Sequence, residues 1–298
     1  MLKVHAALFL VSLFYAILFS FAGQIMPKYL DPGLFVWMRV TVAAAMFFLI
    51  AKIRKNKSKI DWKKDGKEIA LCAFLGTSGN MLLFFYGLRY TLPINGAVLM
   101  LCTPIIVAII EHTKYRISPK AFQIKGLALA SICSFFLISS KGISIAKGDI
   151  FGDILVAINA AFYAFYLVRV KPLLFKYSPN KLNSATFGIS ILYVLPFAIW
   201  PAFHTDFSVI PMDVWAKIAY ILVVTTFIVY QLNSYAVKHS TPQLAAVYIY
   251  LQPVMAGTIA LLLGREPFSI NKVILCILII LGVWLVNKFK PKFTLSNQ

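Results

Sequence analysis

Residues 86–104 read YGLRYTLPINGAVLMLCTP, and residues 235–253 read YAVKHSTPQLAAVYIYLQP. At a constant offset of 149 residues, the second segment repeats the first at a tyrosine, an alanine–valine pair and two prolines, and it has a lysine where the first has an arginine. Each copy holds its prolines in an apolar stretch. Near the start of each half, Phe-Tyr-Ala at residues 14–16 recurs at residues 162–164. Such spacing indicates a chain built from two copies of one design.

Composition identifies the solvent of this chain as a lipid bilayer. The mean hydropathy is +0.82, with 60% hydrophobic and only 13% charged residues, which is too apolar for a soluble protein of 298 residues. The net charge of +19 comes from basic residues in short segments between apolar runs, so no nucleic-acid partner is expected. The cysteines fall inside apolar runs without paired metal-ligand spacing, which predicts small core residues and no metal site.

Ten apolar runs are long enough for helices that cross about 30 Å of hydrocarbon. They lie near residues 5–26, 33–51, 69–88, 94–112, 122–139, 151–169, 183–203, 214–236, 243–263 and 271–287. The predicted fold class is all-α integral membrane, with ten transmembrane helices in two five-helix repeats over residues 1–145 and 146–298. The first run follows Lys3 as a secretory signal would, but its counterpart in the second half argues that it is retained.

The distribution of lysine and arginine sets the orientation. If the N-terminus is cytoplasmic, the inside segments carry 21 of these residues and the outside segments seven, with Arg39 within a span. The positive-inside rule therefore places both termini in the cytoplasm. Because five spans per repeat is an odd number, the second repeat enters the membrane inverted relative to the first. Inverted repeats are typical of transporters that work by alternating access, since the two copies can exchange inward and outward shapes.

The repeated prolines indicate where helices bend. Pro93 and Pro242 begin the fourth and ninth spans, and Pro104 and Pro253 follow 11 residues later, about 16 Å along a helix and so near the midplane. Each midplane proline lacks an amide donor and frees the carbonyl four residues earlier, which a neighbour, water or ligand must satisfy. One such proline is commonly a simple kink. Two at the same repeat position favour a structural or gating role for these four prolines.

Uncharged polar residues gather at the same depth. Several follow helical spacing on one face of a span, where they can donate and accept hydrogen bonds. The candidate substrate-binding residues are Tyr15, Asn80, Thr103, Asn159, Tyr163, Tyr230, Asn233, Tyr248 and Gln252. The alternative for each is hydrogen bonding between helices, which such residues commonly provide in membranes. Their concentration on a few spans of both halves favours a shared cavity.

Charge inside the membrane is scarce. Arg39 is the only basic residue well within a span, and its cost in hydrocarbon predicts that it faces protein, water or the outer headgroups. We group it with the prolines as a structural or gating residue, with snorkelling to the outer surface as the alternative. No carboxylate lies near the midplane, so coupling to a proton gradient is unsupported, although Glu111, His112 or His5 near the inner surface could carry a proton.

Signatures of enzymes are missing from the sequence. It has no paired midplane carboxylates, no histidine–acid metal cluster, no Ser–His–Asp candidate and no phosphate-binding glycine loop. The long loop at residues 52–68 is rich in lysine and suits anionic headgroups. We therefore predict no catalytic residues and no cofactor. The rival class is a polytopic membrane enzyme or an assembly protein.

The chain resembles the EamA-type branch of the drug/metabolite transporter superfamily, the ten-helix permeases of bacteria. The resemblance covers essentially the whole chain. It rests on residues 93–104 with their copy at 242–253, on Arg39, and on Gly-Arg-Glu-Pro-Phe at residues 264–268, which is similar to the family's glycine–glutamate–x–(proline or leucine) exit from the ninth helix. The first-half equivalent at residues 114–118 lacks the glutamate, which weakens any role assigned to that pair.

The resemblance implies an inner-membrane carrier, often an exporter of amino acids and related metabolites, with a central cavity built by helices one, three, four, six, eight and nine. It leaves the substrate open, since one scaffold serves many cargoes. A polar, tyrosine-rich cavity suits a zwitterionic or aromatic solute. We therefore expect a monomeric permease that exports small amphiphilic metabolites, foremost amino acids, by alternating access. The alternative within transport is uptake of a nucleotide-derived metabolite such as S-adenosylmethionine.

Overall fold

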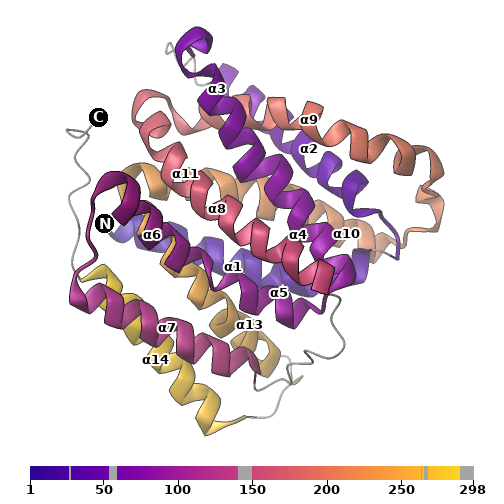
Figure 1. Cartoon of the computed structure of the whole chain (residues 1–298). Helices are drawn as coiled ribbons and strands as arrows, with labels where there is room; N and C mark the ends of the chain where they lie inside the picture. The colour runs from indigo at the N-terminus through magenta and orange to yellow at the C-terminus, as the bar shows by residue number, and fades with distance from the viewer. Residues whose placement is uncertain (27, 54–58, 140–149, 263, 265–267, 289–298) are drawn as a thin grey trace.

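The computed structural model describes residues 1–26, 28–53, 59–139, 150–262, 264 and 268–288. Helices account for nearly all of these residues, and no strand occurs among them. Within this part of the chain, ten helical spans are long and apolar enough to cross a membrane (Figure 1). The predicted all-α membrane fold with ten spans in two inverted repeats is confirmed. The predicted boundary between the repeats, at residues 145 and 146, lies outside the described residues.

The first repeat has three uninterrupted spans and two interrupted ones. In chain order its elements are α1 (Leu2–Ile25), α2 (Pro32–Ile53), α3 (Trp62–Ala73) continued by the π-helical η1 (Phe74–Ser78) and α4 (Gly79–Tyr90), α5 (Pro93–Met100) followed by α6 (Thr103–Tyr115), and α7 (Ala121–Ser139). The third span begins before the predicted residue 69 because Asp61 caps it. The Asp61 carboxylate accepts a hydrogen bond from the backbone N–H of Lys64 at 3.1 Å.

The second repeat is interrupted in the corresponding spans, its third and fourth. Its elements are α8 (Ile150–Lys176), α9 (Pro179–His204), the short 3-10 turn η2 (Phe207–Val209), α10 (Met212–Tyr220) continued by the π-helical η3 (Ile221–Ile228) and α11 (Val229–His239), α12 (Pro242–Val247) continued by the 3-10 turn η4 (Tyr248–Tyr250) and α13 (Leu251–Leu262), and α14 (Ile270–Asn287). Since each interruption recurs, it is a property of the repeated design.

Helix packing follows the repeat. The helices α2 and α9, which are counterparts, pack along each other, and so do the counterparts α7 and α14, as Figure 1 shows. The helix α4 corresponds to α11, and α8 corresponds to α1. The contact between α4 and α8 therefore has a counterpart in the contact between α11 and α1. The two repeats are therefore related by a pseudo-two-fold axis. We call the side on which α1 begins the N-terminal face, and the other side the opposite face.

Small residues allow the closest helix crossings. On α7, a side-chain carbon added at Gly126 would lie 2.7 Å from the backbone oxygen of Gly282 on α14, and one added at Gly282 would lie 2.8 Å from that of Gly126. A similar crossing joins Gly87 of α4 to Gly152 of α8. Close approach through small residues is the usual way that membrane helices associate, because burial in lipid offers little hydrophobic gain between them.

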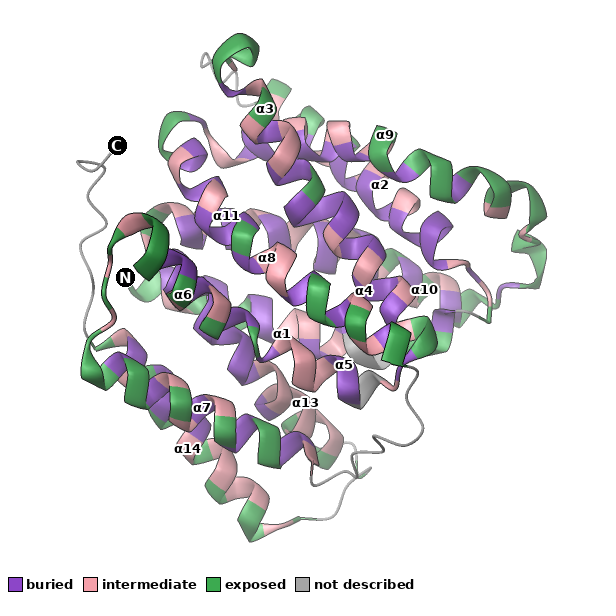
Figure 2. Cartoon of the chain, in the orientation of Figure 1, coloured by how far each residue is buried: buried purple, intermediate pink, exposed green. Residues whose placement is uncertain are grey.

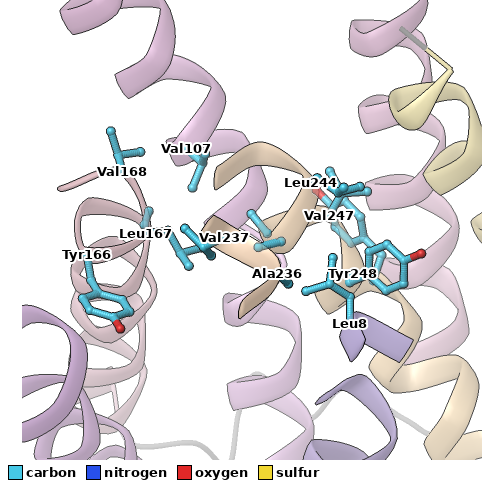
Figure 3. Packing of buried hydrophobic residues seen from close by; sticks show 14 of the residues in the cluster. Leu8, Val107, Tyr166, Leu167, Val168, Ala236, Val237, Leu244, Val247 and Tyr248 are labelled. Carbon is cyan, nitrogen blue, oxygen red and sulfur yellow. The ribbon is translucent and has the colours of Figure 1, made fainter. Parts of the chain in front are cut away.

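The interior and the outer surface are both apolar. Figure 2 shows buried residues on the inward faces of the helices and exposed ones along outer helices such as α9 and α14. Large apolar side chains remain exposed, among them Trp200 and Phe203 on α9 at 72% and 85%. That pattern suits contact with lipid. Near the N-terminal face, Val107, Leu167, Val237 and other residues of α6, α8 and α11 form one continuous core (Figure 3).

Candidate functional site

A cavity of about 70 Å³ lies between spans of both repeats. Eight of the nine predicted substrate-binding residues line it, namely Tyr15, Asn80, Asn159, Tyr163, Tyr230, Asn233, Tyr248 and Gln252. Arg39 lines it as well. The lining side chains come from the first, third, fourth, sixth, eighth and ninth spans, which are the spans that the family resemblance implies, and Arg39 adds the second. The inverted repeat thus brings together residues that are more than 200 positions apart in the sequence.

A reciprocal pair of hydrogen bonds joins α4 to α8 at the cavity wall. The side-chain amide of Asn159 donates to the Asn80 carbonyl at 2.7 Å, and that of Asn80 donates to the Asn159 carbonyl at 3.3 Å. Asn159 is only 1% exposed, and its Oδ1 has no hydrogen-bond partner among the described residues. A buried acceptor without a partner costs about 1–3 kcal/mol. This oxygen is therefore a ready acceptor for a donor on a ligand.

Two further polar contacts tie α11 to the first repeat and to α8. The side-chain amide of Asn233 donates to the Tyr163 hydroxyl oxygen at 2.7 Å. The Tyr230 hydroxyl donates to the carbonyl of Gly76, in η1, at 2.6 Å. Each of these two hydroxyl groups thus has a partner among the described residues, and both tyrosines line the cavity.

Arg39 is buried in the protein interior and does not snorkel. It is 2% exposed, and its Nε donates to the Thr226 hydroxyl, in η3, at 2.8 Å. Its guanidinium lies over the ring of Phe85, 4.9 Å from the centroid. None of the ion pairs in the described part of the chain involves Arg39. The alternative of an arginine at the outer headgroups is therefore wrong.

The ninth span meets α1 at the cavity. The Tyr248 hydroxyl and His5 Nδ1 share a hydrogen bond of 2.7 Å, and the Ser12 hydroxyl donates to the Tyr248 carbonyl at 2.8 Å. Gln252 borders a second pocket of about 440 Å³, mostly apolar, between α13, α14 and α7. Gln252 therefore stands on the wall that the two spaces share.

The prolines lie where the fourth and ninth spans change direction or geometry. Pro93 and Pro242 are the first residues of α5 and α12. Just before Pro104, α5 ends and two i to i+3 hydrogen bonds link it to α6; just before Pro253, the chain forms the 3-10 turn η4. Such turns are compatible with a proline, which cannot continue the hydrogen-bond pattern of an α-helix.

Thr103 does not line the cavity, unlike the other candidates. It is fully buried, and its hydroxyl is directed to the Ala160 carbonyl of α8 at 3.4 Å. The interhelical alternative therefore describes Thr103. Thr103 is the first residue of α6, so the direction of its side chain depends on the geometry of the interruption that precedes this helix. Of the exit motif after the ninth span, Arg265, Glu266 and Pro267 lie outside the described residues.

Two pairs of hydroxyl residues escaped the sequence analysis. Thr77 and Ser78 in η1 both donate to a single carbonyl at the start of that turn, and Thr225 and Thr226 in η3 do the same. Hydroxyl groups that take over helix carbonyls allow the wider π-helical geometry, which is frequent at functional sites. The signal that could have revealed them is the recurrence of two adjacent hydroxyl residues at the 148-residue offset of the repeat.

The helix α8 makes hydrogen bonds to two connections between helices, one in each repeat. We call residues 90–93, between α4 and α5, the first corner, and residues 239–242, between α11 and α12, the second corner; they are counterparts at an offset of 149. Near the start of α8, the Asp153 carboxylate accepts a hydrogen bond from the Thr91 hydroxyl of the first corner. Near its end, Lys171 reaches the second corner.

Buried charges cap both helix ends at the second corner. Lys171, 2% exposed, donates to the carbonyls of Val237, Lys238 and Ser240 at 2.6, 3.0 and 2.5 Å. Glu111 of α6, 4% exposed, lies beside the backbone N–H of Gln243 in the first turn of α12. A cation at a helix C-terminus and an anion at a helix N-terminus both oppose the helix dipoles favourably.

Known proteins share this sequence pattern and fold. The EamA-like transporter family matches residues 2–140 and again residues 150–288. The chain is 25% identical to the "Uncharacterized transporter YyaM" of Bacillus subtilis over 100% of its own length and 98% of that protein. It is 27% identical to an Archaeoglobus fulgidus "Uncharacterized transporter" over 96% and 97%.

A chain of solved structure shares the fold, with a TM-score of 0.74 over 98% of both chains at 15% sequence identity. The two family matches cover both repeats and nearly all of the described helices. The protein is therefore a multi-pass membrane transporter, and it belongs to the EamA-like transporter family.

Proposed function

We propose that this transporter is an alternating-access permease that exports small amphiphilic metabolites, foremost amino acids, across the cytoplasmic membrane of a bacterium. The observation that carries the proposal is the 70 Å³ cavity, whose polar wall is built by both repeats. A site shared between inverted repeats can be exposed to either side of the membrane as one repeat rocks against the other.

The chemistry of the cavity supports an amphiphilic solute. Tyrosine hydroxyls and amides offer uncharged donors and acceptors, while Met81, Phe84 and Phe85 supply an apolar wall beside them. S-adenosylmethionine carries a sulfonium cation in addition to the carboxylate and ammonium of an amino acid, and a cavity whose charged lining residue is Arg39 would repel this extra positive charge. Amino acids are therefore favoured over that alternative.

The size of the cavity supports a change of shape during transport. Sites for metabolite-sized ligands usually enclose about 300–1,000 Å³, several times the 70 Å³ seen here. The helices must therefore separate to admit a solute. The repeated interruptions of the third, fourth, eighth and ninth spans are suitable places for that bending.

Transport is proposed to be facilitative, with both termini in the cytoplasm. No acidic side chain lines the cavity in the described part of the chain, so the solute site lacks the group that proton coupling usually requires. For the orientation, single cysteines in place of Lys64 on the N-terminal face and Lys217 towards the opposite face should be labelled from the cytoplasm and from outside, respectively. Labelling of both from one side would contradict the inverted arrangement.

The direct test is transport by purified protein in proteoliposomes. Labelled amino acids, S-adenosylmethionine and nucleosides are loaded inside, and their efflux is followed with and without the protein. Saturable, protein-dependent flux of an amino acid is the expected result. Chemical turnover of a compound without flux would instead indicate the rival class, a membrane enzyme.

A further inference from the structure

The charge of the cavity is unbalanced. Among the side chains that line it, Arg39 carries a charge and no aspartate or glutamate is present. A guanidinium has five N–H donors, and in the described part of the chain Arg39 donates one hydrogen bond, from Nε to Thr226. Its charge lies against the Thr226 hydroxyl and the Phe85 ring, neither of which is an anion, and pairing with an anion lowers the cost of burying a charge. Arg39 is therefore placed to receive an anionic group.

The number and arrangement of the N–H donors of Arg39 favour a carboxylate as the anionic group. The terminal nitrogens of a guanidinium present a planar fork that matches the two oxygens of a carboxylate. A phosphate monoester would bring nearly two negative charges, for which the cavity lining offers one cation. One carboxylate matches the single charge of Arg39.

A second feature of the cavity points to a donor on the same solute. Asn159 Oδ1 is buried and has no partner among the described residues, while the amide nitrogen of Asn159 is occupied by the Asn80 carbonyl. An ammonium or hydroxyl group of the solute would satisfy this acceptor. Phe84 and Phe85 line the same cavity and supply apolar surface for the rest of the solute.

We propose that Arg39 binds the carboxylate of the transported solute and that Asn159 accepts a hydrogen bond from its ammonium group, so that the site selects zwitterions such as α-amino acids. This inference rests on the proposed transport function. It assigns Arg39 to solute binding, beyond the structural or gating role that its position in a span suggests.

The experiment compares related solutes rather than one solute. Counterflow is measured in proteoliposomes with each of the common amino acids, its α-carboxamide and its deaminated monocarboxylate. The variants are Arg39→Met, Arg39→Lys and Asn159→Leu. The matched control is Arg89→Met, which also removes an arginine charge, from an ion pair with Asp31 in which the Arg89 side chain is 39% exposed.

For the wild type and Arg89→Met, we expect amino acids to be preferred to their carboxamides by roughly 10- to 150-fold in kcat/KM, the range for a hydrogen bond to a charged group. Arg39→Met should remove this preference by slowing the acids alone, and Arg39→Lys should retain part of it. Asn159→Leu should instead remove the preference for amino acids over their deaminated forms. A purely structural Arg39 would slow acids and amides equally.

The outcomes separate this inference from the proposed function. Saturable flux in which acids and carboxamides are equivalent, or in which uncharged nucleosides move and carboxylates do not, would overturn the carboxylate site and leave the carrier function intact. If no solute is transported by protein that a thermal denaturation curve shows to be folded, both the carboxylate site and the carrier function are overturned.

Discussion

At the second corner, Lys171 donates three hydrogen bonds, which we call the clamp. The substitution Lys171→Met removes them while keeping the length of the side chain. The Lys171 ammonium donates to three carbonyls at and just after the end of α11. The last carbonyls of a helix have no partner within the helix, so a side chain or water must supply one. Methionine fills the same space without a donor. The variant therefore isolates these hydrogen bonds from the packing of the stem.

The expected loss of stability is about 3 kcal/mol, from three hydrogen bonds at about 1 kcal/mol each. Release of the desolvation cost of the ammonium acts in the opposite direction, so that figure is an upper estimate. For a protein of this size, 1 kcal/mol corresponds to a change in Tm of about 2 °C. The melting temperature should fall by about 6 °C.

The assay uses the cysteines of the protein. Cys72 and Cys133 are 0% and 5% exposed, so a thiol-reactive dye reports their release as the protein unfolds in detergent. The control is Lys217→Met, which breaks an i, i+4 ion pair with Asp213 in which the side chains are 22% and 67% exposed. Such pairs contribute about 0.3–0.5 kcal/mol, or about 1 °C. Equal shifts for the two variants would refute the clamp.

Three further predictions follow from the site and the packing. Tyr248→Ala and Gln252→Ala should each weaken solute affinity about fivefold, the value of about 1 kcal/mol for a lost hydrogen bond, with membrane insertion intact; normal KM in both would mean that the cavity is not the solute site. Glu111→Gln should retain downhill flux without a pH difference, whereas accumulation driven by a pH gradient and abolished by this variant would make Glu111 a proton carrier. Gly126→Ala should lower the Tm, because the added carbon lies 2.7 Å from a backbone oxygen of α14, while Gly188→Ala, which meets nothing within 4 Å, should not; similar effects would contradict the close crossing.

The spans and the breaks in the fourth and ninth of them could be predicted from the sequence because they depend on local chemistry. Hydropathy identifies a helix that crosses lipid, and a proline removes a backbone donor wherever it stands. The prediction that polar residues share a cavity needed only the repeat. In inverted copies, counterpart residues near the midplane of the membrane lie close to each other at the axis that relates the repeats. Tyr15 and Tyr163, counterparts at an offset of 148, both line the cavity for this reason.

The directions of individual side chains could not be predicted, because they depend on the rotation of each helix. Thr103 follows an interruption, so its direction is set by the geometry of that break. The partner of Arg39 is Thr226, 187 residues away, on a π-helical turn that shifts the following residues around the helix axis. Arg39, which lines the cavity, is hydrogen-bonded to this turn.

In the proposed alternating-access cycle, departures from symmetry would decide which of two related shapes this protein favours. If the repeats were identical, a shape closed at one face and its inverted equivalent would have equal free energy. At the 148-residue offset, however, Lys171 of α8 corresponds to Gly23 of α1, where an added side-chain carbon would meet nothing within 4 Å. Glycine cannot donate to the carbonyls of the first corner, so the clamp on the second corner has no equivalent from α1. A clamp of about 3 kcal/mol would favour the shape closed at the second corner by roughly 100-fold, since every 1.4 kcal/mol is a factor of ten. On this proposal the contribution of Lys171 to the bias comes from a side chain and not from the fold, and a relative with a lysine at both positions would be expected to lose that contribution.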